Sequence, residues 1–170
     1  MTKAALTDRL SVTTIARRPD LLPVVADWLW REWWRPTGRT LEETEAMYEA
    51  CRAEVGAPQT LVLLSGETPI GTATLARHDL EERPDLTPWL AGVFIVPEAR
   101  GRGCVKRLLT AFDEACVAAS IETAWLYTGT AERVYLRAGW RVAETIQRSG
   151  KPPTTLMRRD FSRREGKTSN

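Results

Sequence analysis

Residues 93–106 constrain the fold of this 170-residue chain more than any other stretch. An apolar run reaches Pro97, a short turn rich in arginine and glycine follows, and an amphipathic helix is expected from Gly103 onwards. This order of strand, turn and helix directs free backbone N–H groups and the positive end of a helix dipole to one place. The segment therefore predicts a site for phosphate groups, and for a pyrophosphate in particular.

Composition and charge limit the class of protein. Hydrophobic residues make up 43% and charged residues 27% of the chain, as in a soluble globular domain large enough for its own core. The net charge of +2 is too small to indicate nucleic acid. We expect a flexible N-terminus over residues 1–10, one domain over 11–160 and a disordered basic tail over 161–170.

The cysteines and the single histidine argue against a metal site. Cys51, Cys104 and Cys116 have no metal-ligand spacing, and no second histidine joins them. The sequence has no secretory signal and no long apolar run, so we expect a cytoplasmic protein with reduced thiols and no membrane segment.

The hydrophobic periodicity predicts a mixed sheet with helices packed on it. Strands are expected at 11–16, 60–64, 69–77, 89–96, 122–127, 140–147 and 154–160, and helices at 20–34, 41–55, 103–119 and 131–138. This order predicts an α/β (α+β) fold of about seven strands and about four helices.

Local signals support two of these helices and give the first one an apolar face. Thr40 and Glu43 form a predicted capping box, and Gly139 is a natural left-handed cap. In the first helix, the residues expected to share one buried face are Leu22, Val25, Ala26, Leu29 and Trp33. Trp30 and Trp34 flank that face, which makes them candidates for a pocket wall.

The glycine-rich turn has three interpretations. A dinucleotide-binding fingerprint needs a third glycine where this chain has Lys106, and a Walker loop is absent. An ordinary strand-to-helix turn is the remaining structural alternative.

Two motifs together resemble the GNAT superfamily of N-acetyltransferases. The strand before Pro97 and the turn with Arg100 and Gly103 resemble motif A, in which Val105 replaces the usual glycine or alanine. Downstream, residues 134–140 resemble the family's aromatic block, with Tyr135, Gly139 and Trp140 in place and Val134 replacing an aromatic residue. The resemblance extends over residues 10–160, and residues 85–92 resemble one group of small bacterial members.

The resemblance implies a GNAT fold and acetyl-CoA as cosubstrate, with no metal. In such enzymes acetyl-CoA lies between two neighbouring parallel strands that a bulge parts, and pairs with the upstream strand. The implied cofactor-binding residues are Val93, Phe94, Ile95, Arg100, Gly101, Arg102, Gly103, Cys104, Val105, Lys106 and Thr128.

The resemblance also assigns roles in acetyl transfer. Tyr135 is the expected general acid for the leaving thiolate. His78 is the candidate base, because it titrates near neutrality without help. The candidate acceptor-binding residues are Trp30, Trp34, Asp79 and Asp85. Cys104, at a helix start, is interpreted as a packing residue in place of a nucleophile.

The expected activity is transfer of an acetyl group to a primary amine by direct attack in a ternary complex. The acceptor is a small molecule or a peptide amine, which includes a protein N-terminus or lysine. Alternatives are an acyl-CoA-binding sensor without turnover and a nucleic-acid binder acting through the basic tail. A homodimer is one possible assembly.

Overall fold

A seven-stranded mixed sheet runs through the protein in the computed structural model, which describes residues 9–161. The strand order is β1-β2-β3-β4-β5-β7-β6, and only β4 and β5 are parallel neighbours. This arrangement confirms the predicted mixed sheet. The predicted basic tail lies outside the described residues except for Phe161, and most of the predicted flexible N-terminus also lies outside them.

The regular elements follow the predicted order. The strands are β1 (Leu10–Thr14), β2 (Gln59–Ser65), β3 (Thr68–Ala76), β4 (Trp89–Ile95), β5 (Thr123–Thr128), β6 (Arg141–Arg148) and β7 (Lys151–Asp160). The α-helices are α2 (Leu22–Leu29), α3 (Leu41–Glu49), α4 (Cys104–Ala118) and α5 (Glu132–Arg137). Shorter helical segments are η1 (Pro19–Leu21), η2 (Trp30–Trp34), η3 (Arg35–Thr37) and η4 (Pro97–Ala99).

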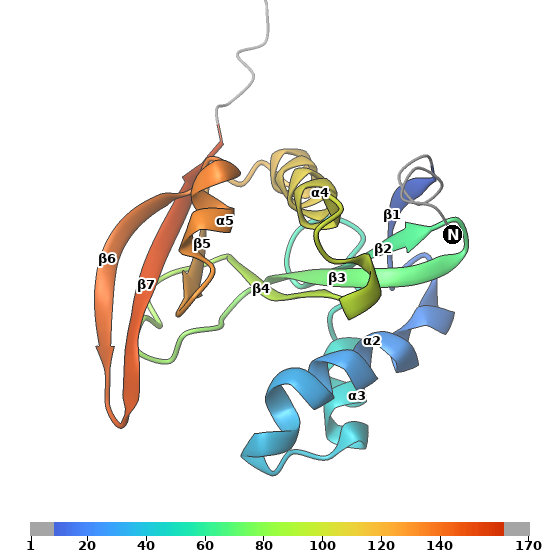
Figure 1. Ribbon diagram of the computed structural model, residues 1–170, viewed down its shortest axis with the longest axis horizontal. Coiled ribbons are helices and arrows are strands. Elements are labelled where there is room, and N and C mark those ends of the chain that lie inside the picture. The colour runs from blue at the N-terminus through green and yellow to red at the C-terminus, as the bar shows by residue number, and fades with distance from the viewer. Residues whose placement is uncertain (1–8, 162–170) are drawn as a thin grey trace, which may run out of the picture.

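Strand β2 is buried on both faces and joins two hydrophobic clusters. Leu61 and Leu63 belong to the cluster under α4, whereas Val62 and Leu64 belong to the cluster formed with α2 and α3. Successive side chains of a strand point to opposite faces, so a continuous apolar run packs helices on both sides of the sheet. In Figure 1, α4 lies on one side of β1–β4, and α2 and α3 lie on the other.

The sheet parts between β4 and β5. These strands pair only at Trp89 and Trp125, after which β5 continues beside β7. Between the pairs Thr72–Phe94 and Thr74–Ala91, β4 has one residue more than β3, which is a β-bulge at residues 92–93. Figure 1 shows the resulting halves, with β1–β4, α2 and α3 in one and β5–β7 with α5 in the other.

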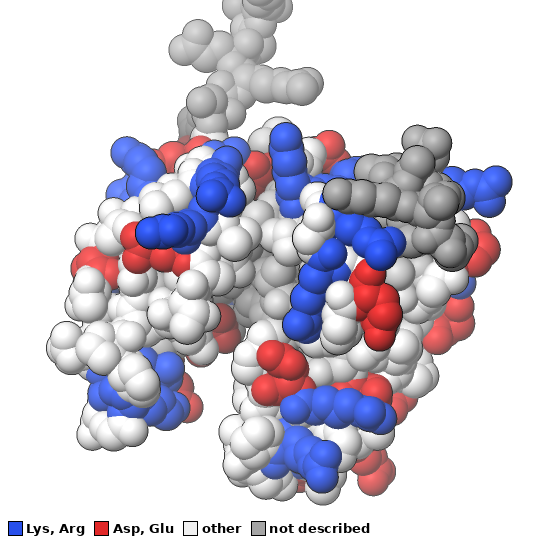
Figure 2. Space-filling view, in the orientation of Figure 1, with Lys and Arg blue, Asp and Glu red and all other residues white. Residues whose placement is uncertain are grey.

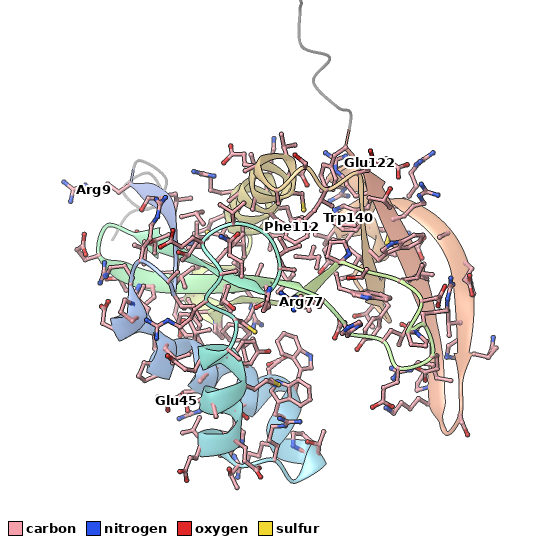
Figure 3. The ribbon with its side chains drawn as sticks, turned by 180° about the vertical axis from the view of Figure 1, so that it is seen from behind. Arg9, Glu45, Arg77, Phe112, Glu122 and Trp140 are labelled. Carbon is pink, nitrogen blue, oxygen red and sulfur yellow. The ribbon has the colours of Figure 1, made fainter. Side chains whose placement is uncertain are left out.

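Helix α4 joins the two halves. Its Phe112 lies against Trp140, with ring centroids 6.1 Å apart, as Figure 3 shows from behind. Arg159 of β7 donates to Asp113 of α4 at 2.6 Å, and its guanidinium covers Gly139. Gly139 has a φ of +88°, so it needs glycine both for its backbone and for the space that Arg159 fills.

Two predicted boundaries were wrong. The helix expected over 41–55 ends at Glu49, because the buried amide of Gln59 donates to the carbonyls of Ala53 and Glu54 and holds the chain in a turn. Strand β7 begins at Lys151 rather than 154 and includes two prolines. Because β5 reaches only to Thr155 along β7, the proline end has a neighbour on one side alone, where proline is tolerated.

We predict that Gly139→Ala destabilises the protein more than Gly150→Ala, a matched left-handed glycine with open space around it. Both changes cost about 1–2 kcal/mol of backbone strain. Gly139→Ala also displaces Arg159 from Asp113, which adds about 1–3 kcal/mol. Urea denaturation measures both free energies of unfolding, and equal values would contradict this account of Gly139.

Candidate active site

The parting of the sheet leaves one edge of β4 without a neighbouring strand. From residue 90 onwards, β4 has no partner on the β5 side among the described residues. An exposed strand edge of this kind can pair with the amide groups of an extended ligand. The predicted cofactor residues Val93, Phe94 and Ile95 lie on this segment.

Arg100 closes the end of that edge. Its Nε donates to the carbonyl of Ile95 at 2.9 Å, and its guanidinium lies over the Phe94 ring, 5.7 Å from the centroid. The side chain therefore fixes the passage from β4 into the turn, and a contact with a cofactor phosphate stays a prediction.

The turn that follows presents a row of free N–H groups. Gly101 and Gly103 have φ angles of +70° and +77°, and a Cβ at either would project into open space. The first hydrogen bond of α4 runs from Arg107 N to Gly103 O. Within residues 9–161, none of the N–H groups of residues 101–106 donates to an acceptor. These groups and the helix dipole together favour an anion.

An open hollow of about 400 Å³ lies beside this turn. Its lining residues are Leu10, Arg102, Gly103, Lys106, Arg107 and Thr110. Figure 2 shows Lys and Arg side chains over this end of α4. The predicted residues Arg102 and Lys106 thus share one hollow, and Arg107, which the sequence analysis did not single out, joins them one residue along the helix. Val105 packs partly buried against the core and does not line the hollow.

Tyr135 lies on the core side of α5. Its ring is 6.4 Å from that of Trp140 in an edge-on arrangement, and burial raises its pKa to about 12. Its hydroxyl makes no hydrogen bond within the part of the chain that the structure describes. The predicted cofactor residue Thr128 instead accepts from Ala131 N at 3.0 Å, which fixes the turn leading into α5. The turn that leads to Tyr135 is therefore fixed, and the Tyr135 hydroxyl has no hydrogen-bond partner among the described residues.

Aromatic side chains line the other side of β4. The Tyr48 hydroxyl accepts from Trp34 Nε1 at 3.4 Å and lies 3.6 Å from where a Cβ on Gly92 would be, directly over the bulge. Trp28 lies against Phe94, with ring centroids 5.6 Å apart. Tyr48 is a site residue that sequence reasoning missed. Its signal was the spacing of Thr44 and Tyr48, which form the buried face of α3.

The structure divides the predicted tryptophans differently from the sequence. Trp33 was expected on the buried face but is 41% exposed, because the chain changes from α-helix to π-helix over Trp30–Trp34 and the wider turn shifts the buried face. Trp30 donates from Nε1 to the carbonyl of Arg39 at 2.8 Å and so joins η2 to the segment that leads into α3. Of the two predicted pocket residues, Trp34 contacts Tyr48, whereas Trp30 is hydrogen-bonded to the backbone carbonyl of Arg39.

The three candidate residues in the segment before β4 have different surroundings. His78 is exposed and makes no side-chain hydrogen bond with the described residues. The Asp85 carboxylate is bound by Arg83 at 2.8 and 2.9 Å, which lowers its pKa. Asp79 keeps a path to solvent, but protein atoms crowd its carboxylate and raise its pKa to about 6, against the opposing charge of Arg148.

Asp79 belongs to the segment that joins β3 to β4. Its charge contributes, after burial, to the raised pKa values of Tyr48 on α3 and Tyr127 on β5. Asp79 is thus an acid of this segment whose charge acts on groups in both halves. Figure 2 shows the surface hollowed between the two halves.

Other chemistries find little support among residues 9–161. The thiol of Cys104 is buried, and burial raises its pKa, so it packs in the core. Within these residues no group of His, Cys, Asp and Glu side chains is arranged to hold a metal ion. No described helix has the length and apolar character needed to cross a bilayer.

Comparison with known proteins gives a consistent family. A profile described as the acetyltransferase (GNAT) family matches residues 24–140. No curated protein is significantly similar in sequence.

Solved structures share the fold at low sequence identity. An acetyltransferase of the GNAT family from Streptococcus pneumoniae is 17% identical with a TM-score of 0.69, covering 91% of this chain and 100% of that one. An aminoglycoside 6'-N-acetyltransferase complexed with coenzyme A is 11% identical with a TM-score of 0.71, covering 88% and 96%. The putative acetyltransferase yncA from Salmonella typhimurium, solved with acetyl-CoA, is 14% identical with a TM-score of 0.67, covering 91% and 95%.

We predict that the double substitution Lys106→Gln, Arg107→Gln lowers the affinity for inorganic pyrophosphate at least about tenfold, since a charge-assisted hydrogen bond contributes about 1.5–3 kcal/mol. Isothermal titration calorimetry measures the affinity. Arg17→Gln, an exposed arginine after β1, is the control and should bind as the wild type does. Equal affinities in the double variant and the control would remove the anion site from this hollow.

Proposed function

Because the chain belongs to the GNAT family of acetyltransferases, we propose that it transfers the acetyl group of acetyl-CoA to a primary amine in a ternary complex. The observation that carries this proposal is the continuous path from the unpaired edge of β4 to the free N–H groups of residues 101–106. The structural neighbours with coenzyme A or acetyl-CoA support the choice of cosubstrate.

The residues present fit this cosubstrate. The N–H groups of residues 101–106 would receive its pyrophosphate, and an added Cβ at Gly101 or Gly103 would fill the space in front of them. Arg102, Lys106 and Arg107 supply positive charge, and the β4 edge supplies backbone groups for the pantetheine amides. Acetyl-CoA supplies the activated thioester.

Two groups of the protein would act on the thioester. A backbone N–H of the β4 edge, at Phe94 or Ile95, would polarise its carbonyl, as a preorganised donor does for a developing oxyanion. The Tyr135 hydroxyl would protonate the leaving thiolate. Burial raises the pKa of Tyr135 to about 12, which keeps the phenol protonated until a thiolate forms against it. The same burial would raise the basicity of that thiolate, so the transfer can proceed in this dry setting.

Asp79 replaces His78 as the base in this proposal. An alkylamine has a pKa near 10, so the acceptor arrives as an ammonium that a carboxylate can bind. The ammonium first releases one proton to solvent, and the lone pair of the neutral amine then attacks the carbonyl carbon. The nitrogen of the resulting adduct is far more acidic, and Asp79 can take its second proton as the thiolate leaves. Both side chains have access to solvent, but the charge of Asp79 acts on Tyr48 in one half and on Tyr127 in the other.

The acceptor class is a small-molecule amine. The neighbouring aminoglycoside acetyltransferase supports an amine on a small molecule, and the aromatic wall of Trp28, Trp34 and Tyr48 supports a compact one. A sensor without turnover gains no support from the two departures from the family motifs, since Val105 lies off the hollow and Val134 is 41% exposed.

We predict that Tyr135→Phe lowers kcat about 100-fold and leaves the affinity for coenzyme A unchanged, because only the proton donor is lost. Free-thiol release measures kcat, and calorimetry with coenzyme A measures the affinity. A variant that turns over as fast as the wild type would exclude Tyr135 as the acid. A wild type that binds coenzyme A but acetylates no amine would favour the sensor.

We predict that Asp79→Asn lowers kcat/KM about 100-fold or more. In the wild type, kcat/KM should rise with pH through about 6 as the carboxylate loses its proton, and the variant should lack this rise. The raised pKa means that the folded form holds this proton more tightly than the unfolded form, so the wild type loses stability as pH rises from about 4 to about 6.

Melting temperatures separate catalysis from folding in this variant. At pH 7.5 Asp79→Asn should be at least as stable as the wild type, because it lacks a negative charge that the crowding protein atoms disfavour. Glu81→Gln, an exposed acid two residues along, is the matched control and should keep full activity. A pH-dependent loss of activity in His78→Ala, with Asp79→Asn active, would make His78 the base.

A further inference from the structure

Arg39 is a half-buried arginine on the acceptor side of the site that has no carboxylate partner. Its guanidinium lies 4.7 Å from the centroid of the Trp34 ring, and its hydrogen bond goes to the Met47 sulfur at 3.6 Å, a weak acceptor. Within residues 9–161 no acidic side chain forms an ion pair with it. The backbone of Arg39 is fixed, because its carbonyl accepts from Trp30 Nε1.

Outside the hollow beside α4, which Arg102 and Arg107 line, the other partly buried arginines of the described residues have an acidic partner. Arg148 stacks on Tyr127 in a similar way, but its Nε donates to Glu82 at 2.9 Å. Arg159 is paired with Asp113. Hydrogen bonds with Thr40 lower the pKa of Glu43, and the charge of Arg39 lowers it further. The Oε2 atom of Glu43, however, accepts from Thr40 N at 2.8 Å in the helix cap, so Glu43 is not an ion-pair partner of Arg39. Away from that hollow, Arg39 is therefore a partly buried cation whose fork of donors has no acidic partner among the described residues.

The position of Arg39 connects it to the reacting centre. Arg39 stacks on Trp34, Trp34 donates to the Tyr48 hydroxyl, and that hydroxyl lies over the bulge at Gly92. Asp79 acts on the same hydroxyl with the opposite sign: its charge raises the pKa of Tyr48, whereas Arg39 lowers it, both after the larger effect of burial. The surroundings of Tyr48 thus contain both a cation, Arg39, and an anion, Asp79.

We infer that the acceptor is a primary amine that also bears a carboxylate, with Arg39 binding the carboxylate and Asp79 binding the ammonium. This inference rests on the proposed function, since it names the substrate of the same site. A guanidinium held over an indole keeps its fork of donors in place, and that fork matches the two oxygens of a carboxylate. A polycationic amine lacks a group for Arg39 and would bring a second positive charge towards it.

The first test compares amines that differ only in this charge. Glycine, 4-aminobutanoate, 6-aminohexanoate and phenylalanine are each assayed with acetyl-CoA beside the corresponding amide, and kanamycin represents the polycationic amines. For the acid of best fit, kcat/KM should exceed that of its amide at least about tenfold, the difference made by one charge-assisted hydrogen bond. Equal rates for acids and amides, or kanamycin as the best acceptor, would overturn the inference.

The second test uses Arg39→Gln beside a matched control. The variant should raise KM for the best acid at least about tenfold, change kcat little and leave the amide unaffected. Arg39→Lys keeps the charge without the fork and should give an intermediate KM. Arg35→Gln removes an exposed arginine that stacks on Trp30 in the same segment, and it should behave as the wild type does. Identical behaviour of Arg39→Gln and Arg35→Gln would also overturn the inference.

Binding without turnover separates this inference from the proposed function. Calorimetry with the same acids and amides, on protein with and without coenzyme A, reads acceptor binding alone. Saturable heat with an acid, lost in its amide and in Arg39→Gln, supports the inference even where no acetyl transfer follows. No heat with any acid overturns it, while coenzyme A binding and transfer to other amines would leave the proposed function standing.

Discussion

Two parallel strands that stay paired at a single position govern this structure. Neighbouring parallel strands normally exchange hydrogen bonds along their shared length, but β4 and β5 do so only at Trp89 and Trp125. The sheet withstands the interruption because the core continues around it. Trp89 is fully buried, Trp125 N donates to Pro88 O at 3.0 Å, and Phe112 of α4 packs on Trp140 across the halves. These contacts keep the gap between β4 and β5 open in the native state, so the edge of β4 stays unpaired.

The same interruption gathers the chemistry at one place. The edge of β4 ends at Ile95, where Arg100 closes it, and the next residues present their N–H groups at the start of α4. On the opposite side of the edge, the bulge at Gly92 brings Tyr48 and Trp34 close to the backbone. An anion site and an aromatic acceptor space therefore adjoin the same strand, β4. The length of β4 between the bulge at Gly92 and the turn after Ile95 sets the distance between them.

Local sequence signals predicted what depends on local physics. The capping box of Thr40 and Glu43, the left-handed glycine at 139 and the strand, turn and helix around Gly103 are all present. Each depends on residues a few positions apart. The predictions that were wrong, and the contacts that were missed, depend on residues that are far apart in the sequence. Helix α3 ends early because of Gln59, ten residues beyond Glu49 along the chain.

The candidate site shows the same limit. The charge of Asp79 acts on Tyr48 from a segment about thirty residues away, which no periodicity in either segment reveals. Trp33 was assigned to the core by a regular helical spacing, and a single π-helical turn was enough to exchange its place with Trp34. The family resemblance supplied Tyr135 and the cofactor strand, and the sequence analysis also named Trp34 and Asp79, whereas Tyr48 and Arg39 came only from the structure.

The ion pair between Arg159 and Asp113 has a consequence for the opening itself. Since β4 and β5 share so few backbone bonds, the width of the gap is not set at the gap. Contacts away from the gap contribute to it, among them Arg159, which reaches from β7 over Gly139 to Asp113 of α4. Evolution can therefore adjust how far apart the two walls stand by altering side chains that no reactant ever meets.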